Sequence, residues 1–324
     1  MLSWRKKKEI RKLWRTAFGD SESFIRLYFK WVYKDENALV IEHKGKVVSS
    51  LQLIPYTMNY FGEEIPLAYI SGACTHEKER GKGWMSQLML EAFEEMKRRG
   101  IALAALIPAN KPLFGYYSKH GFTEAFEYSR TLYTQPEYIL PKQDYLFLPV
   151  EKPTASAYEY FERKLKERPA GVLHDYGDMV NICRDMELSG GAIFAAFRPI
   201  TLEPCGLAFA VPADASAPHP DRYLLVKELF YDDEDTKNAL LHEVTRSFNV
   251  KQAVYRQPCL PGQPCYPYGM ARVMDIPRMV GIWLAAHPNS NYTKGELLDM
   301  EAGALASLLL GYPNRTAYMS LMLD

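Results

Sequence analysis

The sequence predicts an α/β protein of the mixed α+β kind, with two mixed β-sheets, their flanking helices and a small C-terminal segment of helix and strand. Three observations predict it. The order strand, strand, strand, helix, strand occurs twice along the chain, which indicates an internal repeat. Residues Met85–Lys97 place their apolar side chains on one face of a helix. The apolar run Ile101–Ile107 that follows is typical of a strand buried on both faces.

The first repeat occupies residues 1–135. Its expected elements, in order, are a basic amphipathic helix at Arg5–Arg15, strands at Ala38–Ile41, Val47–Leu53 and Ile65–Thr75, the helix Met85–Lys97 and the buried strand Ile101–Ile107. The turn 43–46 joins the first two strands as a hairpin. Gly100 stands where a glycine commonly ends a helix.

Proline clusters mark two boundaries, one after residue 135 and one after residue 257. They divide the chain into units 1–135, 136–257 and 258–324. The second unit has expected strands at Ala192–Phe197, Cys205–Val211, Tyr223–Tyr231 and Val250–Tyr255 and a helix at Asp235–Phe248. The third has expected helices at Ile276–Ala286 and Lys294–Leu310 and an apolar end, Tyr318–Leu323, that reads as a short strand.

Net charge and cysteine content indicate which partners and which cellular compartment are compatible with the sequence. The 39 basic and 39 acidic residues cancel, so no bulk basic field favours nucleic acid or an anionic membrane as a partner. No apolar stretch has the length of a membrane span, and the N-terminus lacks the apolar core of a signal peptide, so we expect a cytoplasmic protein. Five scattered cysteines fit a reducing compartment and argue against a disulfide framework. Cys259 and Cys265 have no matching His or Cys pair, so no metal site is expected.

The loop between the third strand and the long helix carries the clearest functional signal. Gly81 and Gly83 allow a sharp turn, and the first N–H groups of a helix have no partners within it. With the helix dipole and the charges of Arg80 and Lys82, these groups predict a phosphate or pyrophosphate site. The spacing is neither that of a Walker A loop nor that of a Rossmann fingerprint. The alternative is a plain glycine-containing turn.

A second signal follows the buried strand. Pro108 would end the pairing of that strand with its neighbour and leave a gap between two parallel strands. Free backbone groups in such a gap suit an extended ligand. Asn110 offers an amide to this ligand, and Tyr117 offers a phenol near its reactive end.

Together these segments resemble the GNAT acetyltransferase superfamily. Arg80–Met85 is similar to its [RQ]xxGx[GA] pyrophosphate loop, although Met85 stands where the superfamily usually has Gly or Ala. Asn110, Tyr117 and the pair Gly121-Phe122 are similar to its second signature. The Eis subgroup often carries a bulkier residue at the place of Met85. It combines a GNAT domain, a degenerate GNAT-like domain and a sterol-carrier-like domain, which resembles the order here with a shortened last unit.

The resemblance implies that acetyl-CoA is the donor and a primary amine, on a small molecule or a lysine side chain, the acceptor. The implied cofactor-binding residues are Ala73, Cys74, Thr75, Arg80, Gly81, Lys82, Gly83, Trp84, Met85, Ser86 and Asn110. It implies Tyr117 as general acid, with a merely packed tyrosine as the alternative. It implies the C-terminal carboxylate of Asp324 as base, with a disordered or merely structural terminus as the alternative.

Several other residues receive weaker roles. The acidic stretch Tyr231–Asp235 lacks glycine, so only the first copy is expected to bind a cofactor. His76 and His120 are expected to be loop or surface histidines. Cys74 is expected to contribute its backbone rather than a thiol nucleophile, because no activating partner is evident.

Two other functions remain open. A catalytically inactive acyl-CoA-binding sensor would keep the fold, and Met85 in the loop leaves room for it. An aminoacyl transferase that uses charged tRNA would need a basic surface, which the charge balance disfavours. We expect no nucleic-acid or membrane partner. The resemblance suggests a homo-oligomer, although the shortened last unit removes surface for one.

Overall fold

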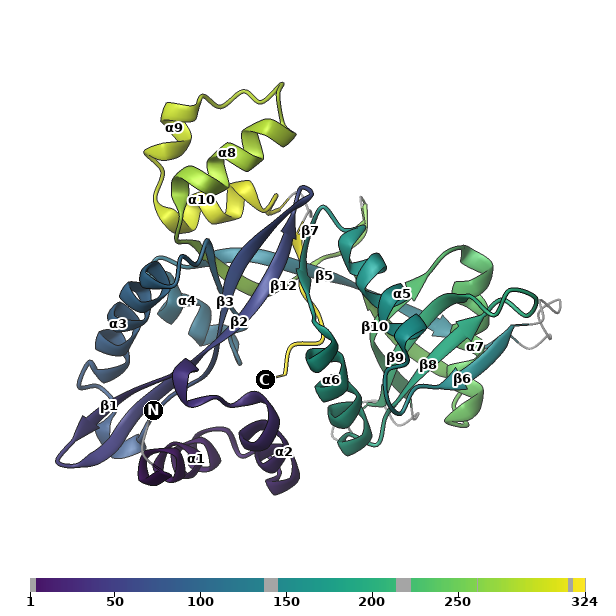
Figure 1. The fold of residues 1–324 in the computed structure, drawn as a ribbon, viewed down its shortest axis with the longest axis horizontal. Helices are drawn as coiled ribbons and strands as arrows, with labels where there is room; N and C mark the ends of the chain where they lie inside the picture. The colour runs from purple at the N-terminus through teal and green to yellow at the C-terminus, as the bar shows by residue number, and fades with distance from the viewer. Residues whose placement is uncertain (1–3, 137–144, 214–222, 261, 314–316, 324) are drawn as a thin grey trace.

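A 13-stranded β-sheet runs through the described part of the molecule, with helices packed on its faces (Figure 1). The computed structural model describes residues 4–136, 145–213, 223–260, 262–313 and 317–323. The strands lie in the order β13-β7-β2-β3-β4-β12-β5-β11-β10-β9-β8-β6, and β1 pairs with β2 beside this path. The predicted fold class, a mixed α/β protein, is confirmed.

The N-terminal half contains the elements predicted from its sequence and three more. They are α1 (Trp4–Phe18), α2 (Glu22–Leu27), β1 (Ala38–His43), β2 (Lys46–Tyr60), β3 (Glu63–Thr75), α3 (Trp84–Arg98), β4 (Leu103–Leu106), α4 (Lys111–Ser118) and β5 (Thr123–Thr134). The apolar face of α3 is buried as its periodicity predicts. The elements α2, α4 and β5 were not predicted, because none has a strong periodic pattern of its own.

The second half repeats the strand and helix order in a second stretch of sheet. Its elements are β6 (Leu146–Pro149), α5 (Ala155–Lys166), β7 (Ala170–Leu173), α6 (Tyr176–Leu188), β8 (Ala192–Phe197), β9 (Pro204–Pro212), β10 (Tyr223–Tyr231), α7 (Glu234–Ser247) and β11 (Gln252–Gln257). Strands β10 and β11 run parallel, as β3 and β4 do in the first half. The part of the proline-rich stretch that is described includes β6.

Strand exchange joins the two halves. Residues 129–134 of β5 pair with β11, and residues 123–128 pair with β12 (Tyr266–Val273), which returns from the C-terminal segment. Strand β12 also pairs with β4, so it lies inside the first sheet. Strand β7 pairs with β2 of the first half. These long-range pairings depend on chain topology and left no signal in the local sequence.

The C-terminal segment packs on the N-terminal half. Its remaining elements are α8 (Ile276–Ala286), α9 (Lys294–Leu298), α10 (Ala302–Leu309) and β13 (Ala317–Tyr318). The single helix expected at Lys294–Leu310 is therefore two helices. The strand expected at Tyr318–Leu323 is wrong beyond Tyr318, because the following residues are held by side-chain contacts rather than by a strand ladder. None of the described helices is long and apolar enough to cross a bilayer.

The described C-terminal tail, residues 319–323, is buried between the two halves (Figure 1). Met319 and Met322 lie in the core cluster of the first half, whereas Leu321 lies in that of the second half. The tail therefore contributes side chains to both cores.

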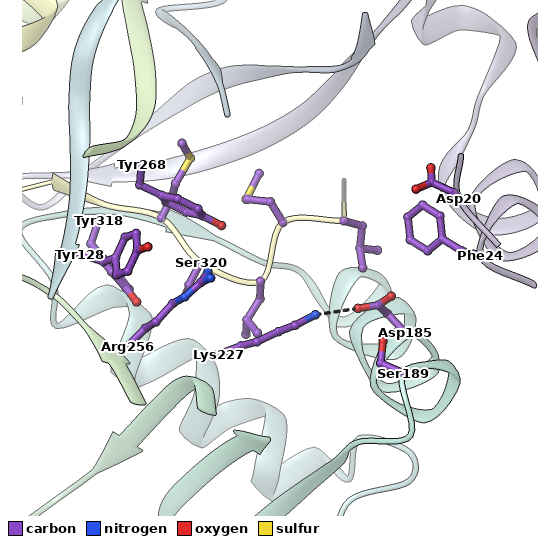
Figure 2. Close-up of a pocket in the computed structure, with 14 residues that line it drawn as sticks. Asp20, Phe24, Tyr128, Asp185, Ser189, Lys227, Arg256, Tyr268, Tyr318 and Ser320 are labelled. Atoms are coloured by element: carbon purple, nitrogen blue, oxygen red, sulfur yellow. Dashed lines mark hydrogen bonds and ion pairs between the residues drawn. The ribbon is translucent and has the colours of Figure 1, made fainter. Parts of the chain in front are cut away.

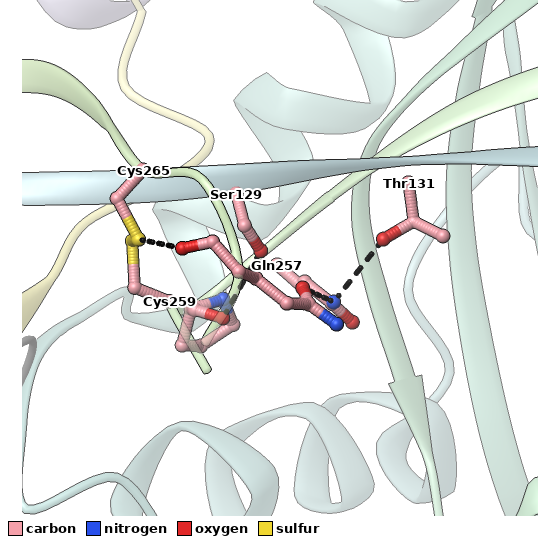
Figure 3. Close-up of a disulfide and its surroundings, with 7 residues drawn as sticks. Ser129, Thr131, Gln257, Cys259 and Cys265 are labelled. Carbon is pink, nitrogen blue, oxygen red and sulfur yellow. Dashed lines mark hydrogen bonds between the residues drawn. A yellow bond between two sulfur atoms is a disulfide. The ribbon is translucent and has the colours of Figure 1, made fainter. Parts of the chain in front are cut away.

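One disulfide corrects the expectation from the cysteine count. Cys259 and Cys265 are bonded and close the loop between β11 and β12 (Figure 3). Gln257, the last residue of β11, donates through Nε2 to Thr131 Oγ1 of β5 at 3.3 Å. Cys74, Cys183 and Cys205 are buried free thiols. The pairing was missed because loop geometry, which brings the two Cα atoms to 5.9 Å, is not visible in the sequence.

Candidate active site

The loop before α3 presents an open helix N-terminus. Gly81 and Gly83 have φ angles of +75° and +82°, the left-handed region that favours glycine. A Cβ built on either glycine would meet no atom within 4 Å, so the loop has free space beside it. Gly83 caps α3 without a side-chain acceptor. The N–H groups of the first helical turn, Trp84 to Ser86, therefore remain available to an anion.

Charged side chains hold this loop in shape. Glu79 accepts hydrogen bonds from Lys82 Nζ at 2.9 Å and from Trp84 Nε1 at 3.3 Å. The hydrogen bond from Lys82 lowers the pKa of Glu79. Arg80 Nε donates to the carbonyl oxygen of Thr75, at the end of β3, at 3.3 Å. Arg80 makes no ion pair with any described residue, so its charge is available at the loop.

The matching helix of the second half is closed. Helix α7 has Asp233 as its N-cap, and this carboxylate accepts from the backbone N–H and the hydroxyl of Thr236 at 2.8 and 2.7 Å. Arg198 also donates to Asp233 at 3.0 Å. A carboxylate of the protein thus occupies the place where a phosphate would bind, which favours a single anion site in the N-terminal half.

Strands β3 and β4 diverge beside the open loop. They pair only over Leu67–Tyr69 and Leu103–Ala105, so residues 70–75 have no β4 partner. Gly72, with φ +61°, bends β3 and lets the Trp14 indole lie against its backbone. Ala73, Cys74 and Thr75 follow this bend. The geometry matches the gap expected from Pro108.

Cys74 lies in this gap but is not an activated thiol. Its side chain is buried, and burial raises the pKa of the thiol to about 11. Its sulfur lies 3.6 Å from Ser50 Oγ, and the described surroundings contain no histidine partner for it. The thiol is protonated near neutral pH, so a transfer through acetyl-cysteine has no support.

Tyr117 is a residue of α4. It lies near Cys74, and its ring packs into the core. The side chain is only 8% exposed. Burial, together with the neighbouring Tyr116 and Cys74, raises the pKa of the phenol to about 12. Tyr117 therefore keeps its proton at neutral pH, as a general acid must. Asn110, at the N-terminus of α4, is exposed and uses no side-chain hydrogen bond to cap that helix.

The two histidines near the motifs differ from each other. His76 caps the short turn after β3, where its Nδ1 accepts from Lys78 N at 3.3 Å. His120 is half-buried, with Nε2 3.4 Å from Ser86 Oγ in the first turn of α3. Burial and the nearby Arg272 of β12 lower the pKa of His120. His120 is a loop histidine, as expected, in the turn after α4, and the neighbouring β12 accounts for its partial burial.

Asp324 lies outside the described residues, but the tail that precedes it is firmly held. Ser320 Oγ donates to the carboxylate of Glu228, which is fully buried on β10. Arg168 donates to both oxygens of Glu228, at 3.0 and 2.9 Å. His174 Nε2 donates to the Ser320 carbonyl at 2.9 Å. Sequence reasoning missed these residues, since a lone Glu on a strand carries no signal of its partner.

His174→Gln is expected to flatten the pH dependence of stability below pH 7. The imidazole is neutral because burial lowers its pKa to about 4, although the hydrogen bond that its Nε2 donates to the Ser320 carbonyl acts in the opposite direction. An unfolded histidine has a pKa of about 6.5. The neutral ring therefore contributes full stability above that value and loses it as the pH falls toward 4, up to about 3 kcal/mol.

The measurement is urea unfolding of both proteins between pH 4.5 and 7.5. Asp178 lies 3.9 Å from His174 Nδ1, and burial raises the pKa of this carboxyl to about 7. Its raised pKa changes stability in the opposite sense over the same pH range. The readout is therefore the difference between the two proteins, and parallel pH profiles would contradict the prediction.

A cavity of about 290 Å³ lies along this tail (Figure 2). The N-terminal helices, the second half and the tail all contribute to its wall. Its lining residues are Asp20, Phe24, Tyr128, Asp185, Ser189, Lys227, Arg256, Tyr268 and Tyr318–Leu323. In the parts of the chain that are described, no group of three His, Cys, Asp or Glu residues is placed to hold a metal ion.

Comparison with known proteins identifies the N-terminal half. Residues 4–125 match a family model described as an acetyltransferase (GNAT) domain. No curated protein matches the chain. This confirms the predicted GNAT resemblance for the segment that holds the open loop and the diverging strands.

Solved structures share the fold over most of the chain. A GCN5-related N-acetyltransferase from Anabaena variabilis has a TM-score of 0.69 at 15% identity, covering 86% of this chain and 73% of its own. A probable N-acyltransferase from Enterococcus faecalis has a TM-score of 0.67 at 16% identity, covering 85% and 72%. Eis1 from Mycobacterium abscessus has a TM-score of 0.65 at 11% identity, covering 87% and 75%. The predicted likeness to Eis proteins is thereby confirmed at the level of the fold, over 87% of this chain.

Proposed function

We propose that this chain, whose residues 4–125 match a family model described as an acetyltransferase (GNAT) domain, is a GNAT-type acyltransferase that moves an acetyl group from acetyl-CoA to a primary amine. The observation that carries this proposal is the uncapped N-terminus of α3 beside the diverging strands β3 and β4, with the protonated Tyr117 at their gap. The acceptor is a small molecule or a lysine side chain.

The loop and strand residues suit the parts of acetyl-CoA. The N–H groups of Gly83 to Ser86 and the charge of Arg80 would hold the pyrophosphate. Residues 73–75 would meet the pantetheine through backbone groups that β4 leaves free. Lys82 and Asn110 would contact the ligand from either side of this path. Open space beside Gly81 and Gly83 supports the fit.

Transfer then requires a neutral amine. Its nitrogen attacks the thioester carbonyl, the N–C bond forms and the C–S bond breaks. A backbone N–H near Ala73 or Cys74 would stabilise the oxyanion. Tyr117 would give its proton to the departing sulfur. We propose the C-terminal carboxylate of Asp324 as the group that takes the proton from the amine. The burial of residues 319–323 supports this, since it anchors the tail up to its penultimate residue.

Met85 bears on the alternative, an inactive acyl-CoA-binding sensor. Its half-buried side chain packs against the core cluster under α3. It therefore does not fill the open side of the loop, which favours cofactor binding but does not separate the enzyme from the sensor. We also retain as proposals the three units 1–135, 136–257 and 258–324, a cytoplasmic location and a homo-oligomer.

Gly83→Asp is expected to weaken acetyl-CoA binding by roughly 100-fold, about 3 kcal/mol, because it places a carboxylate beside the pyrophosphate. Isothermal titration with acetyl-CoA and CoA measures this. Gly62→Asp is the matched control, since Gly62 has φ +90° and equally open space, in the turn between β2 and β3. Absence of binding in the unmodified protein, or equal effects of both substitutions, would refute the cofactor site. Turnover on an amine panel separates enzyme from sensor.

A further inference from the structure

We propose that the cavity along the C-terminal tail is the acceptor site, and that Arg256 selects an amine that also carries a carboxylate or another acidic group. This inference rests on the proposed acetyltransferase function and names the class of its acceptor. It rests on where the cavity lies, on the state of Arg256 and on the separation of charges along the cavity wall.

One end of the cavity lies close to the strand gap, with the side chain of Tyr28 between them. Phe24 lines the cavity, and its ring lies 6.3 Å from that of Tyr28. Tyr28 donates through its hydroxyl to Ser71 Oγ of β3 at 3.0 Å, where β3 has already left β4. Tyr28 also shares a core cluster with Cys74. Tyr28 is thus the side chain that separates the Asp20 and Phe24 end of the cavity from the proposed thioester position, and it must move aside for an amine bound there to attack.

Strand β12, which pairs with β4, contributes to the other wall of the cavity. Tyr268 lines the cavity from β12 and comes two residues before Met270, which pairs with Leu106 at the end of β4. The cavity therefore lies at the same edge of the sheet as the carboxyl end of β4. The contacts of Tyr28 and the position of Tyr268 both place the cavity on the side of the gap opposite to helix α3. The loop proposed to bind the cofactor directly precedes that helix.

Arg256 is a cation that pairs with no acidic residue in the described part of the chain. It projects from β11 into the cavity, beside Ser320 (Figure 2). Its guanidinium carbon lies 4.8 Å from the ring centroid of Tyr128 and 5.6 Å from that of Tyr268. Its Nε is buried and has no hydrogen-bond partner, and none of the described acidic residues pairs with it. A partly buried guanidinium held between two rings suits a planar carboxylate.

The acidic residues lie at the far end of the cavity. Figure 2 shows Asp20, Asp185 and Phe24 grouped away from Arg256 and Tyr128, with Lys227 between the two groups. Lys227 is already paired with Asp185 at 3.4 Å. Asp20 accepts from Trp14 Nε1 at 2.7 Å and keeps capacity for a second donor.

The charge pattern defines the acceptor. An ammonium group would bind at the Asp20 end, next to the strand gap, and lose its proton before attack. The acidic group of the same acceptor molecule would bind at Arg256. The ligand class is therefore an amino acid, a short peptide or another amine with an acidic group. A polycation would place positive charge against Arg256 without compensation, which is costly in a confined cavity.

The test compares amino acids and dipeptides with their carboxamides as acceptors. We expect the unmodified protein to show at least about tenfold higher kcat/KM for the acids, the value of one charge-assisted contact of about 1.4 kcal/mol. Arg256→Gln should reduce kcat/KM for the acids to the level of the amides and lower kcat/KM for the amides much less. Arg130→Gln is the matched control, because Arg130 also lies over Tyr128, at 5.3 Å, but outside the cavity.

Two outcomes would overturn the inference: a preference for amides or polyamines, or an equal loss for acids and amides in Arg256→Gln. Titration of the CoA-bound protein with the same acids and amides gives a readout that does not require turnover. If acetyl-CoA binds and no amine is acetylated, the proposed function fails. The titration still decides whether Arg256 prefers the acids.

Discussion

Tyr117→Phe is expected to lower kcat by about 100-fold or more while the Kd for acetyl-CoA stays unchanged. A positioned general acid typically contributes a factor of this size, and phenylalanine removes only the proton donor. The raised pKa of Tyr117, about 12, keeps the phenol protonated throughout the usual assay range. Activity should therefore show no loss from this group between pH 7 and 10. Single-turnover rates and titration with acetyl-CoA provide the two readouts.

Tyr116→Phe is the control for this substitution. Tyr116 is the preceding residue, its ring lies 5.3 Å from that of Tyr117, and it is less buried. It should change kcat by only a small factor. A fall of equal size in both variants, or a loss of acetyl-CoA binding in Tyr117→Phe, would show that the tyrosine is a packing residue and not the acid.

Glu228→Ala is expected to cost about 3–5 kcal/mol of unfolding free energy, because it leaves Arg168 without its partner in the interior. Glu228 is fully buried, and its carboxylate joins Arg168 to Ser320 of the tail. Removal of this carboxylate should also release the tail and lower acetyl transfer. Urea unfolding, followed by fluorescence and circular dichroism, measures the stability.

An exposed ion pair provides the control for Glu228→Ala. Glu94 and Lys97 pair on the surface of α3 with most of both side chains in solvent, so Glu94→Ala should change stability by about 0.5 kcal/mol or less. Replacement of both Glu228 and Arg168 by apolar residues should recover much of the lost stability. A small effect of Glu228→Ala alone would contradict the assigned role of this buried pair.

Local chemistry made the loop before α3 predictable. The glycines at 81 and 83 sit in a left-handed loop because only glycine adopts that backbone without strain, and the sequence reveals this directly. The amphipathic period of α3 and the apolar run of β4 are likewise local patterns. The second half could be predicted as a repeat for the same reason, and the absence of glycine near Asp233 indicated that its loop differs.

The sequence by itself determined the fold class, the open loop, the position of Tyr117 after the buried strand and the acidic loop of the second half. Only the tertiary structure decided that β12 lies between β4 and β5, that His120 is half-buried, and that Cys259 and Cys265 are bonded. It also decided that Arg168, Glu228 and His174 hold the tail and that Arg256 faces a cavity. The physical reason is that these contacts join residues far apart in the chain. Their energies depend on burial and pairing, which no local pattern encodes.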